Sequence, residues 1–184
     1  MFFEPCDIPD VVKITPTRHD DPRGYFSELF REDLFRAHVA DVRFVQHNQS
    51  LSRPRGTVRG LHYQLAPAAQ GKLVRCLRGS ILDVAVDLRR TSRTFRKHVA
   101  IELSSETQMQ IWVPEGFAHG FCTLTPDTEV WYAVTHPYSP VHERGIVWND
   151  PELGIDWPVS AAEAIVGARD RVLPRLEEYA ADLG

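Results

Sequence analysis

The second half of the chain alternates short apolar runs with turn residues, and this rhythm restricts the fold more than any other feature. Turns such as Ser104-Ser105, Pro114-Glu115-Gly116 and Thr125-Pro126-Asp127 separate the runs. Many short strands with Gly and Pro turns are typical of an all-β sandwich or barrel. The predicted strands are residues 98–103, 109–113, 119–124, 129–135 and 145–148.

The first half continues this pattern and adds one helix. In residues 81–88, Leu82, Val84 and Val86 alternate with Asp83, Ala85 and Asp87, which predicts a strand with one buried face. Since there are no repeats and no internal linker, we expect residues 1–184 to form a single domain. Further strands are predicted at 11–14, 25–30, 44–50, 59–64 and 72–77, and short helices at 31–40 and about 174–183.

The charge balance argues against a general nucleic-acid-binding protein. The net charge is -4 and the pI is near 6.0, whereas such proteins usually carry a strong basic excess. The composition, 43% hydrophobic and 25% charged, is ordinary for a soluble globular protein. No apolar run approaches the length that spans a membrane. We therefore expect neither nucleic acid nor a membrane among its partners.

The cysteines and the first residues indicate a cytoplasmic protein. Cys6, Cys76 and Cys122 are too few and too scattered for a disulfide framework, and they include no CxxC pair. Buried free thiols in a reducing compartment explain them. The opening Met-Phe-Phe-Glu-Pro has an acid and a proline where a signal peptide needs basic and then apolar residues.

The predicted strand around His62 carries the first candidate for chemistry. Because side chains alternate along a strand, Gly60 and His62 are expected on one face and Arg59, Leu61 and Tyr63 on the other. Gly60 is expected to leave open space beside the imidazole, as a ligand pocket requires. A strand histidine also fits a hydrogen-bonded core or surface residue, so this stretch alone does not establish catalysis.

The segment that ends at His119 narrows the fold. Its Pro-x-Gly-x-x-His sequence, Pro114 to His119, resembles the second sequence motif of the cupin jelly rolls. Cupin barrels hold small ligands among inward side chains, and both His62 and His119 can point inward. Many cupins bind a metal through a His-x-His pair and a nearby glutamate, but here Tyr63 and Gln64 follow His62. The sequence therefore predicts no tightly bound metal.

Motifs spread over nearly the whole chain resemble those of the dTDP-4-dehydrorhamnose 3,5-epimerases, sugar-nucleotide epimerases of the cupin superfamily. Each motif alone is weak, and their order along the chain makes the resemblance specific. They are Asp21-Pro22-Arg23-Gly24-Tyr25-Phe26-Ser27-Glu28, Gln46-His47-Asn48, Arg59-Gly60-Leu61-His62-Tyr63-Gln64, Gln70-Gly71-Lys72-Leu73-Val74-Arg75, Asp83-Val84-Ala85-Val86-Asp87-Leu88-Arg89, Trp112-Val113-Pro114-Glu115-Gly116-Phe117-Ala118-His119-Gly120-Phe121 and Glu143-Arg144-Gly145-Ile146-Val147-Trp148-Asn149-Asp150-Pro151.

The resemblance implies a dTDP-linked 4-keto-6-deoxyhexose as the substrate and no cofactor. Removing a hydrogen from C3 or C5 beside the C4 ketone gives an enolate. Inversion needs a base on one face of the sugar, a proton donor on the other and a cation or donor at the oxygen. The implied product is dTDP-4-dehydro-L-rhamnose, made from dTDP-4-dehydro-6-deoxy-D-glucose.

The same resemblance assigns roles to the catalytic residues. His62 is the implied base, Tyr132 the proton donor, and Lys72 the cation near the enolate oxygen. A carboxylate should orient His62, and Asp170 stands at the matching place near the C-terminus, with Asp83 as a second candidate. Without the resemblance, Asp170 fits a solvated acid and Lys72 a surface residue. The implied substrate-binding residues are Arg23, Glu28, Gln46, Asn48, Arg59, His119, Tyr138, Glu143 and Arg169.

Departures from the family's usual residues leave an alternative open. They are Ala133 and Arg169 where lysines are common, His47 where an acid is frequent, and His136-Pro137 where a second aromatic is common. Ala133 and Pro137 are expected to lie beside Tyr132 and to affect its orientation. A tyrosine that reaches one carbon gives a 3-mono-epimerase. A metal-dependent cupin such as a dioxygenase and a non-catalytic binding module are the rival classes. Relatives pair by exchanging N-terminal strands, so a homodimer is expected.

Overall fold

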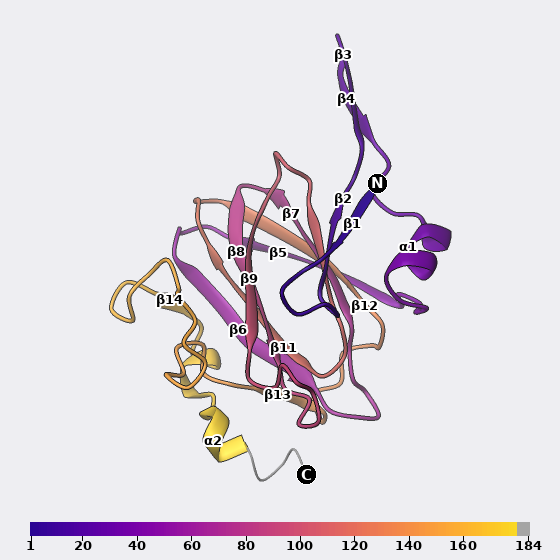
Figure 1. Ribbon diagram of the computed structural model, residues 1–184. Coiled ribbons are helices and arrows are strands. Elements are labelled where there is room, and N and C mark those ends of the chain that lie inside the picture. The colour runs from indigo at the N-terminus through magenta and orange to yellow at the C-terminus, as the bar shows by residue number, and fades with distance from the viewer. Residues whose placement is uncertain (180–184) are drawn as a thin grey trace.

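The computed structural model describes residues 1–179, whose regular secondary structure is mainly β-strand (Figure 1). Two sheets of antiparallel neighbours face each other, and the predicted all-β barrel is confirmed. The first sheet contains, in spatial order, β1 (Phe2–Pro5), β2 (Val12–Thr15), β10 (Gln110–Val113), β7 (Lys72–Arg78), β12 (Thr128–Val134) and β5 (Gln46–Ser52). The second contains β13 (Glu143–Gly145), β6 (Thr57–Gln64), β11 (Phe117–Thr123), β8 (Ser80–Asp87) and β9 (His98–Ser104).

The core lies between the two sheets and shares their inner faces with a polar cavity. Val74 of β7 and Val130 of β12 pack there with Ile81 of β8 and Phe117 of β11. Lys72 and Tyr132 follow the same alternation as Val74 and Val130, so they point between the sheets but line the cavity. The strand period therefore brings the implied catalytic residues inside the barrel.

Strand β8 is buried on both faces, so the prediction of one buried face was wrong. Asp83 and Asp87 point toward the barrel interior and are fully buried. Val84 and Val86 point the other way and pack against Ile146 and other residues of the C-terminal half. The C-terminal half thus covers the apolar face, and the face with the acids, which the sequence pattern left to solvent, lies inside the barrel.

The N-terminal part extends beyond the barrel. Strands β3 (Arg18–Asp21) and β4 (Gly24–Ser27) pair as a two-stranded hairpin that projects from it (Figure 1). The Ser27 hydroxyl donates to the Gln108 side chain at 2.6 Å and ties the base of the hairpin to the barrel. Helix α1 (Glu32–His38) confirms the predicted first helix, and it packs Phe35 against Trp112.

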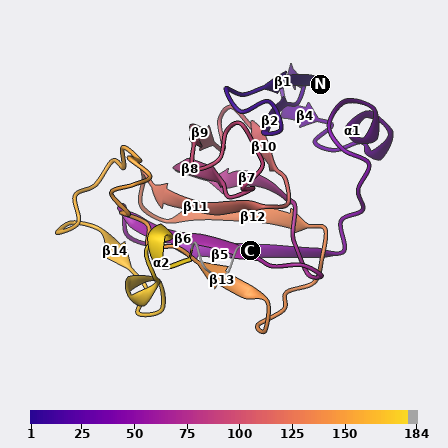
Figure 2. The same ribbon diagram turned by 60° about the horizontal axis from the view of Figure 1, so that its bottom comes forward.

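The C-terminal segment runs along β6 and β13 (Figure 2). Strand β14 (Ile165–Val166) pairs in parallel with β6, and the short 3-10 helix η1 (Asp170–Val172) follows. Helix α2 (Leu176–Tyr179) confirms a C-terminal helix, although residues 180–183 of the prediction lie outside the described residues. The strand predicted at 145–148 lies earlier, as β13. Neither α1 nor α2 is long and apolar enough to cross a membrane.

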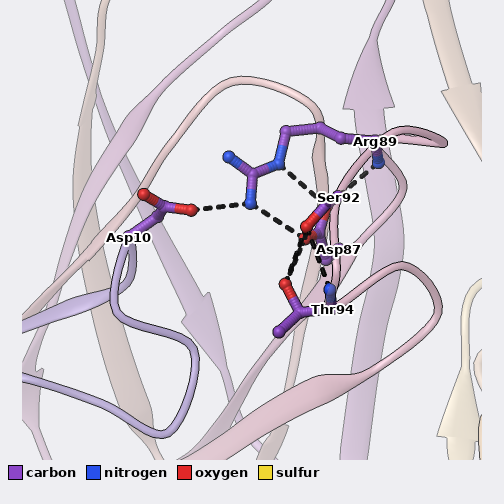
Figure 3. Close-up of polar contacts among 5 residues, drawn as sticks. All are labelled: Asp10, Asp87, Arg89, Ser92 and Thr94. Atoms are coloured by element: carbon purple, nitrogen blue, oxygen red, sulfur yellow. Dashed lines mark hydrogen bonds and ion pairs between the residues drawn. The ribbon is translucent and has the colours of Figure 1, made fainter.

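A polar cluster at Asp87 fastens the end of β8 (Figure 3). The Arg89 guanidinium donates to both Asp87 carboxylate oxygens, at 2.9 and 2.8 Å, and to Asp10 at 2.7 Å. The hydroxyls of Ser92 and Thr94 each donate to Asp87 at 2.6 Å. The pKa of Asp87 falls to about 2, because these hydrogen bonds outweigh the opposing effect of burial. The cluster joins the β8–β9 connection to the loop between β1 and β2.

Candidate active site

Strand β6 contains a β-bulge that aims Arg59 and His62 into one cavity. His62 lies opposite His119 of β11, and Arg59 lies opposite Phe121. Between these pairs β6 advances three residues and β11 only two. The extra residue shifts the alternation, so Arg59 and His62 both line the cavity. The expectation that they point to opposite faces was therefore wrong.

Gly60 allows β6 and β11 to approach each other closely, and it leaves no open space beside His62. A Cβ atom at Gly60 would lie 2.6 Å from the Gly120 Cα and 2.8 Å from the His119 carbonyl oxygen. A Cβ atom at Gly120 would in turn lie 2.7 Å from the Arg59 carbonyl oxygen. Gly60 also has a φ of +118°, which L side chains rarely adopt. The two glycines therefore permit the bulge, and the expectation of a void at Gly60 was wrong.

His62 is paired with Asp170 from the C-terminal segment. The Nε2 atom of His62 lies 2.8 Å from Asp170 Oδ1, and the Gly60 amide donates to Oδ2 at 3.0 Å. Burial raises the pKa of Asp170, but these interactions and the charge of Arg169 bring it below its ordinary value. The ionised carboxylate therefore accepts a hydrogen bond from Nε2–H, and a neutral imidazole in this tautomer carries its lone pair on Nδ1.

Asp83 pairs with His119 and not with His62. Its two carboxylate oxygens lie 2.9 and 3.1 Å from His119 Nε2, and both side chains are buried. Lys72, on the opposite sheet, donates to the His62 carbonyl oxygen at 3.1 Å. Burial lowers the pKa of Lys72 to about 8, although Asp83 and Glu143 oppose the shift. Of the two candidate partners for His62, the structure brings only Asp170 to it.

Tyr132 faces the same cavity from the sheet opposite His62. Burial raises the pKa of its phenol; Arg59 opposes this rise and Glu143 adds to it. The phenol therefore keeps its proton at neutral pH. Within residues 1–179 its hydroxyl makes no hydrogen bond, so the donor is available to a ligand.

The cavity between the sheets has a volume of about 360 Å³ and gathers most of the predicted site. It is also lined by residues that received no role from the sequence, because they carry neither a charge nor an imidazole to mark them. The predicted residues that line it are Arg59, His62, Lys72, His119, Tyr132, Tyr138, Glu143 and Asp170, and the additional ones are Ser50, Tyr63, Gln64, Gln70, Gly120, Phe121 and Gly167.

Three predicted residues lie next to the cavity without lining it. Arg169 and the Tyr138 hydroxyl both donate to Glu143 at the cavity mouth. On β5, Asn48 lies opposite Tyr132. The Gln46 side chain donates to Asn48 Oδ1 at 2.9 Å and accepts from the Tyr138 amide at 2.9 Å. The Gln46 amide thus bonds the protein through both its nitrogen and its oxygen.

Arg23 and Glu28 lie away from this cavity. Arg23 is at the tip of the β3–β4 hairpin, where its side chain is 89% exposed and pairs with Asp21. Glu28 follows the hairpin and is also exposed. Neither residue lines the cavity of its own chain. The structure thus separates these two from the rest of the predicted substrate-binding residues.

Ala133 and His47 occupy the outer face of the first sheet. They lie opposite each other on β12 and β5, and both line an outer cavity of about 510 Å³ that excludes Tyr132. Since neighbouring residues of a strand point to opposite faces, Ala133 does not contact the substrate side of Tyr132. The expectation that Ala133 alters the orientation of Tyr132 is not supported by this placement.

Metal-ligating side chains do not gather within residues 1–179. No group of three or more His, Cys, Asp and Glu side chains is placed there so that it could hold a metal ion. The arrangement instead offers a base with its carboxylate, a phenol on the opposite wall and a buried ammonium. Such a set can move a proton between two faces of a bound molecule.

Comparison with known proteins agrees with this arrangement. A family model described as dTDP-4-dehydrorhamnose 3,5-epimerase matches residues 5–178. The chain belongs to the dTDP-4-dehydrorhamnose 3,5-epimerase family. It is thus one of the isomerases that act on sugar nucleotides. The dTDP-4-dehydrorhamnose 3,5-epimerase of Sinorhizobium fredii is 54% identical to it over 178 residues, which cover 97% of this chain and 91% of that protein.

Solved structures of dTDP-sugar epimerases share the fold, a cupin-like jelly roll. That of dTDP-6-deoxy-D-glucose-3,5-epimerase from Legionella pneumophila, in complex with dTDP-4-keto-L-rhamnose, has a TM-score of 0.93 at 38% identity and covers 99% of this chain and 96% of its own. ChmJ, a 3'-monoepimerase from Streptomyces bikiniensis in complex with dTDP-quinovose, has a TM-score of 0.88 at 34% identity, covering 95% and 88%. The 3,5-epimerase is thus the more similar of the two.

Proposed function

We propose that this family member inverts both C3 and C5 of dTDP-4-dehydro-6-deoxy-D-glucose and forms dTDP-4-dehydro-L-rhamnose. The observation that carries the proposal is that His62, with its Asp170 carboxylate, and Tyr132 line one cavity from opposite sheets. The 3,5-epimerases among its relatives favour double inversion over the 3-mono-epimerase alternative.

Each inversion takes two steps: one proton is removed from the carbon, and another is donated to its opposite face. Nδ1 of His62 accepts the proton, the C–H bond breaks, and its electron pair forms an enolate with the charge on the C4 oxygen. The Tyr132 hydroxyl then donates its proton to the opposite face of the carbon, and the ketone re-forms. Solvent removes the proton from His62 and returns one to the phenolate, so no redox cofactor is required.

Lys72 and His119 are suited to stabilise the enolate oxygen. The Lys72 ammonium is almost fully buried, where water screens a charge poorly and its effect on a developing oxyanion is large. Asp83 fixes the orientation of the His119 ring from behind. Arg59 at the cavity, with its guanidinium fork, suits the diphosphate, and Glu143 and Tyr138 at the mouth suit the sugar and the base.

Product analysis tests the proposed reaction. The enzyme is incubated with dTDP-4-dehydro-6-deoxy-D-glucose, and the sugar product is identified by NMR. The proposal predicts the L-configured 4-keto sugar, and a product inverted at C3 alone would contradict it. The His62→Asn variant serves as the control for catalysis. A non-catalytic binding module would give no product with the wild-type chain, although it would bind the nucleotide.

The hairpin supports a homodimer in which each chain completes the partner's cavity. Arg23 and Glu28 are separated from their own cavity, and Tyr25 and Phe26 on the hairpin expose aromatic side chains at 54% and 69%. A second copy that receives the hairpin would cover these side chains and gain the missing cation at its cavity mouth.

Complementation tests this pairing. The variants Arg23→Ala and His62→Asn are each expected to be nearly inactive alone. If Arg23 acts in the partner's site, a mixed dimer contains one site with both native residues, so mixing and exchanging the two variants restores activity. Activity that stays at the level of the separate variants, in mixtures shown to contain mixed dimers, would contradict the shared site.

We also infer a cytoplasmic location. Cys6, Cys76 and Cys122 are all free thiols within the described part of the chain. Burial raises the pKa of Cys76 and of Cys122 to about 11, so these thiols are unreactive. Unpaired cysteines of this kind fit a reducing compartment.

A further inference from the structure

Four consecutive residues of the loop after β12 have a backbone group bound by a glutamine side chain. The loop, His136 to Ser139, is neither strand nor helix, so its backbone groups have no regular partners. Three glutamine side chains bind them instead. Gln64 donates to the Pro137 carbonyl at 3.3 Å and accepts from the Ser139 amide at 2.8 Å. Gln70 donates to the His136 carbonyl at 2.6 Å, and Gln46 accepts from the Tyr138 amide at 2.9 Å.

The central glutamine of this set is buried and fully engaged. Gln64 is 5% exposed, and its amide nitrogen also donates to the Ala68 carbonyl at 2.6 Å. Because the oxygen accepts from Ser139 and the nitrogen donates to carbonyls, the orientation of the amide is fixed by its partners. Although Gln64 lines the cavity, its polar atoms therefore hold the loop.

The ring held by this loop is Tyr138. Its hydroxyl donates to Glu143, which also accepts from Arg169, while its amide is bound by Gln46. Both ends of the residue are thus fixed, yet 49% of its surface remains exposed at the cavity mouth. A fixed and exposed aromatic face is a suitable surface for stacking a planar ring.

We propose that Gln46, Gln64 and Gln70, here called the glutamine clamp, are positioning residues that hold Tyr138 ready to stack on the base of the nucleotide. The inference rests on the proposed function, which supplies the nucleotide. It gives Gln46 a positioning role, because its amide oxygen and nitrogen each bond a group of the protein. It also assigns a role to Gln64 and Gln70, which stand in the family motifs but received no role from the resemblance.

The clamp acts on affinity because it orders the loop before the ligand arrives. An irregular loop that must be immobilised during binding loses conformational freedom, and this loss weakens the complex. Proton transfer occurs at His62 and Tyr132, and within residues 1–179 the clamp side chains make no hydrogen bond to either residue. Weakening the clamp should therefore raise Kd and KM much more than it lowers kcat.

The test compares Gln64→Met and Gln46→Met with a matched control, Gln49→Met. Gln49 is on the same strand as Gln46 but bonds Glu129 on the outside of the barrel. Hydrogen exchange of the Ser139 amide should accelerate in Gln64→Met and that of the Tyr138 amide in Gln46→Met. The Kd for dTDP should rise by about tenfold in Gln64→Met, because binding must then order the loop that the glutamine held. Gln49→Met should change none of these.

A double-mutant cycle shows whether the clamp works through Tyr138. Tyr138→Ala removes the ring, so adding Gln64→Met to it should weaken dTDP binding little further. Full additivity, or an unchanged Kd in both clamp variants with faster amide exchange, would overturn the inference. If one clamp variant does not fold, the other still decides the result. Failure of wild-type protein to bind dTDP would instead contradict the proposed function.

Discussion

His62 and Asp170 are joined by a contact of 2.8 Å across 108 residues of sequence. Three local features bring them together: the bulge in β6, the parallel pairing of β14 beside it, and the Gly60 amide that holds the second carboxylate oxygen. The consequence is a histidine whose protonated nitrogen faces a carboxylate and whose basic nitrogen is left for the substrate.

Replacing Asp170 by Asn should lower kcat by roughly 10²–10⁴-fold. An amide can donate to Nε2, and this favours the tautomer with its proton on Nδ1, where the base is needed. The loss should appear in steady-state kinetics, with the Kd for dTDP nearly unchanged. Asp156→Asn, at an exposed acid, is the control. Wild-type turnover in Asp170→Asn would show that the pairing with His62 has no part in catalysis.

The pKa of Lys72 predicts that kcat/KM falls on the basic side of the pH profile, which is called the basic limb below. With a pKa of about 8, the ammonium is present at neutral pH and is lost as the pH rises through that value. Values of kcat/KM, which report the free enzyme, should therefore fall above about pH 8. Lys72→Met should have low activity at pH 7 and should lack this limb. A limb that persists unchanged in Lys72→Met must come from another group.

Gly120→Ala tests the bulge. The added methyl would press on the Arg59 carbonyl and on Leu61, and should displace the Gly60 amide from Asp170. Overpacking of this kind costs about 1–3 kcal/mol of stability. Because the variant acts through Asp170, its effect on kcat should be largely absent in an Asp170→Asn background. Equal fold losses in both backgrounds would mean that the glycine serves folding alone.

The sequence predicts those features of the structure whose causes lie in neighbouring residues of the chain. Alternating residues such as Val74 and Val130 indicated strands, and turn residues indicated their ends, so the barrel and helix α1 were predictable. The β6 bulge was not, because it results from contact between Gly60 and Gly120 of another strand. The same limit applies to Asp83 and Asp170: both were candidate partners of His62, and only the packing assigns one to His119 and the other to His62.

Some expectations from the sequence remain predictions. Resemblance predicted Arg23 and Glu28 as substrate contacts, and the structure places them on a projecting hairpin, where only a second chain could give them that role. The single domain over 1–184 also stays a prediction, as do the individual roles of the site residues. Gln64 and Gln70 were quoted within motifs but received no role, because an amide side chain signals nothing until its partners are known.

Acid should unfold the protein partly through Asp87. Its carboxylate has a pKa of about 2 in the fold and about 3.8 as the ordinary value, so its contribution is present above about pH 4 and is lost as the pH falls toward 2. The shift corresponds to about 2 kcal/mol. Asp87→Asn should lower Tm at pH 7 and flatten its fall between pH 4 and 2. Asp41→Asn, at an exposed acid, should retain the wild-type slope.

Deuterium incorporation tests the central claim most directly. Wild-type enzyme is incubated in heavy water with dTDP-4-dehydro-6-deoxy-D-glucose, and the label at each carbon is read by NMR. If His62 and Tyr132 exchange protons at both positions beside the ketone, deuterium should appear at C3 and at C5, and both signals should be lost in His62→Asn. Label at C3 alone would contradict double inversion, and no label at either carbon with folded protein would contradict the acid-base mechanism itself.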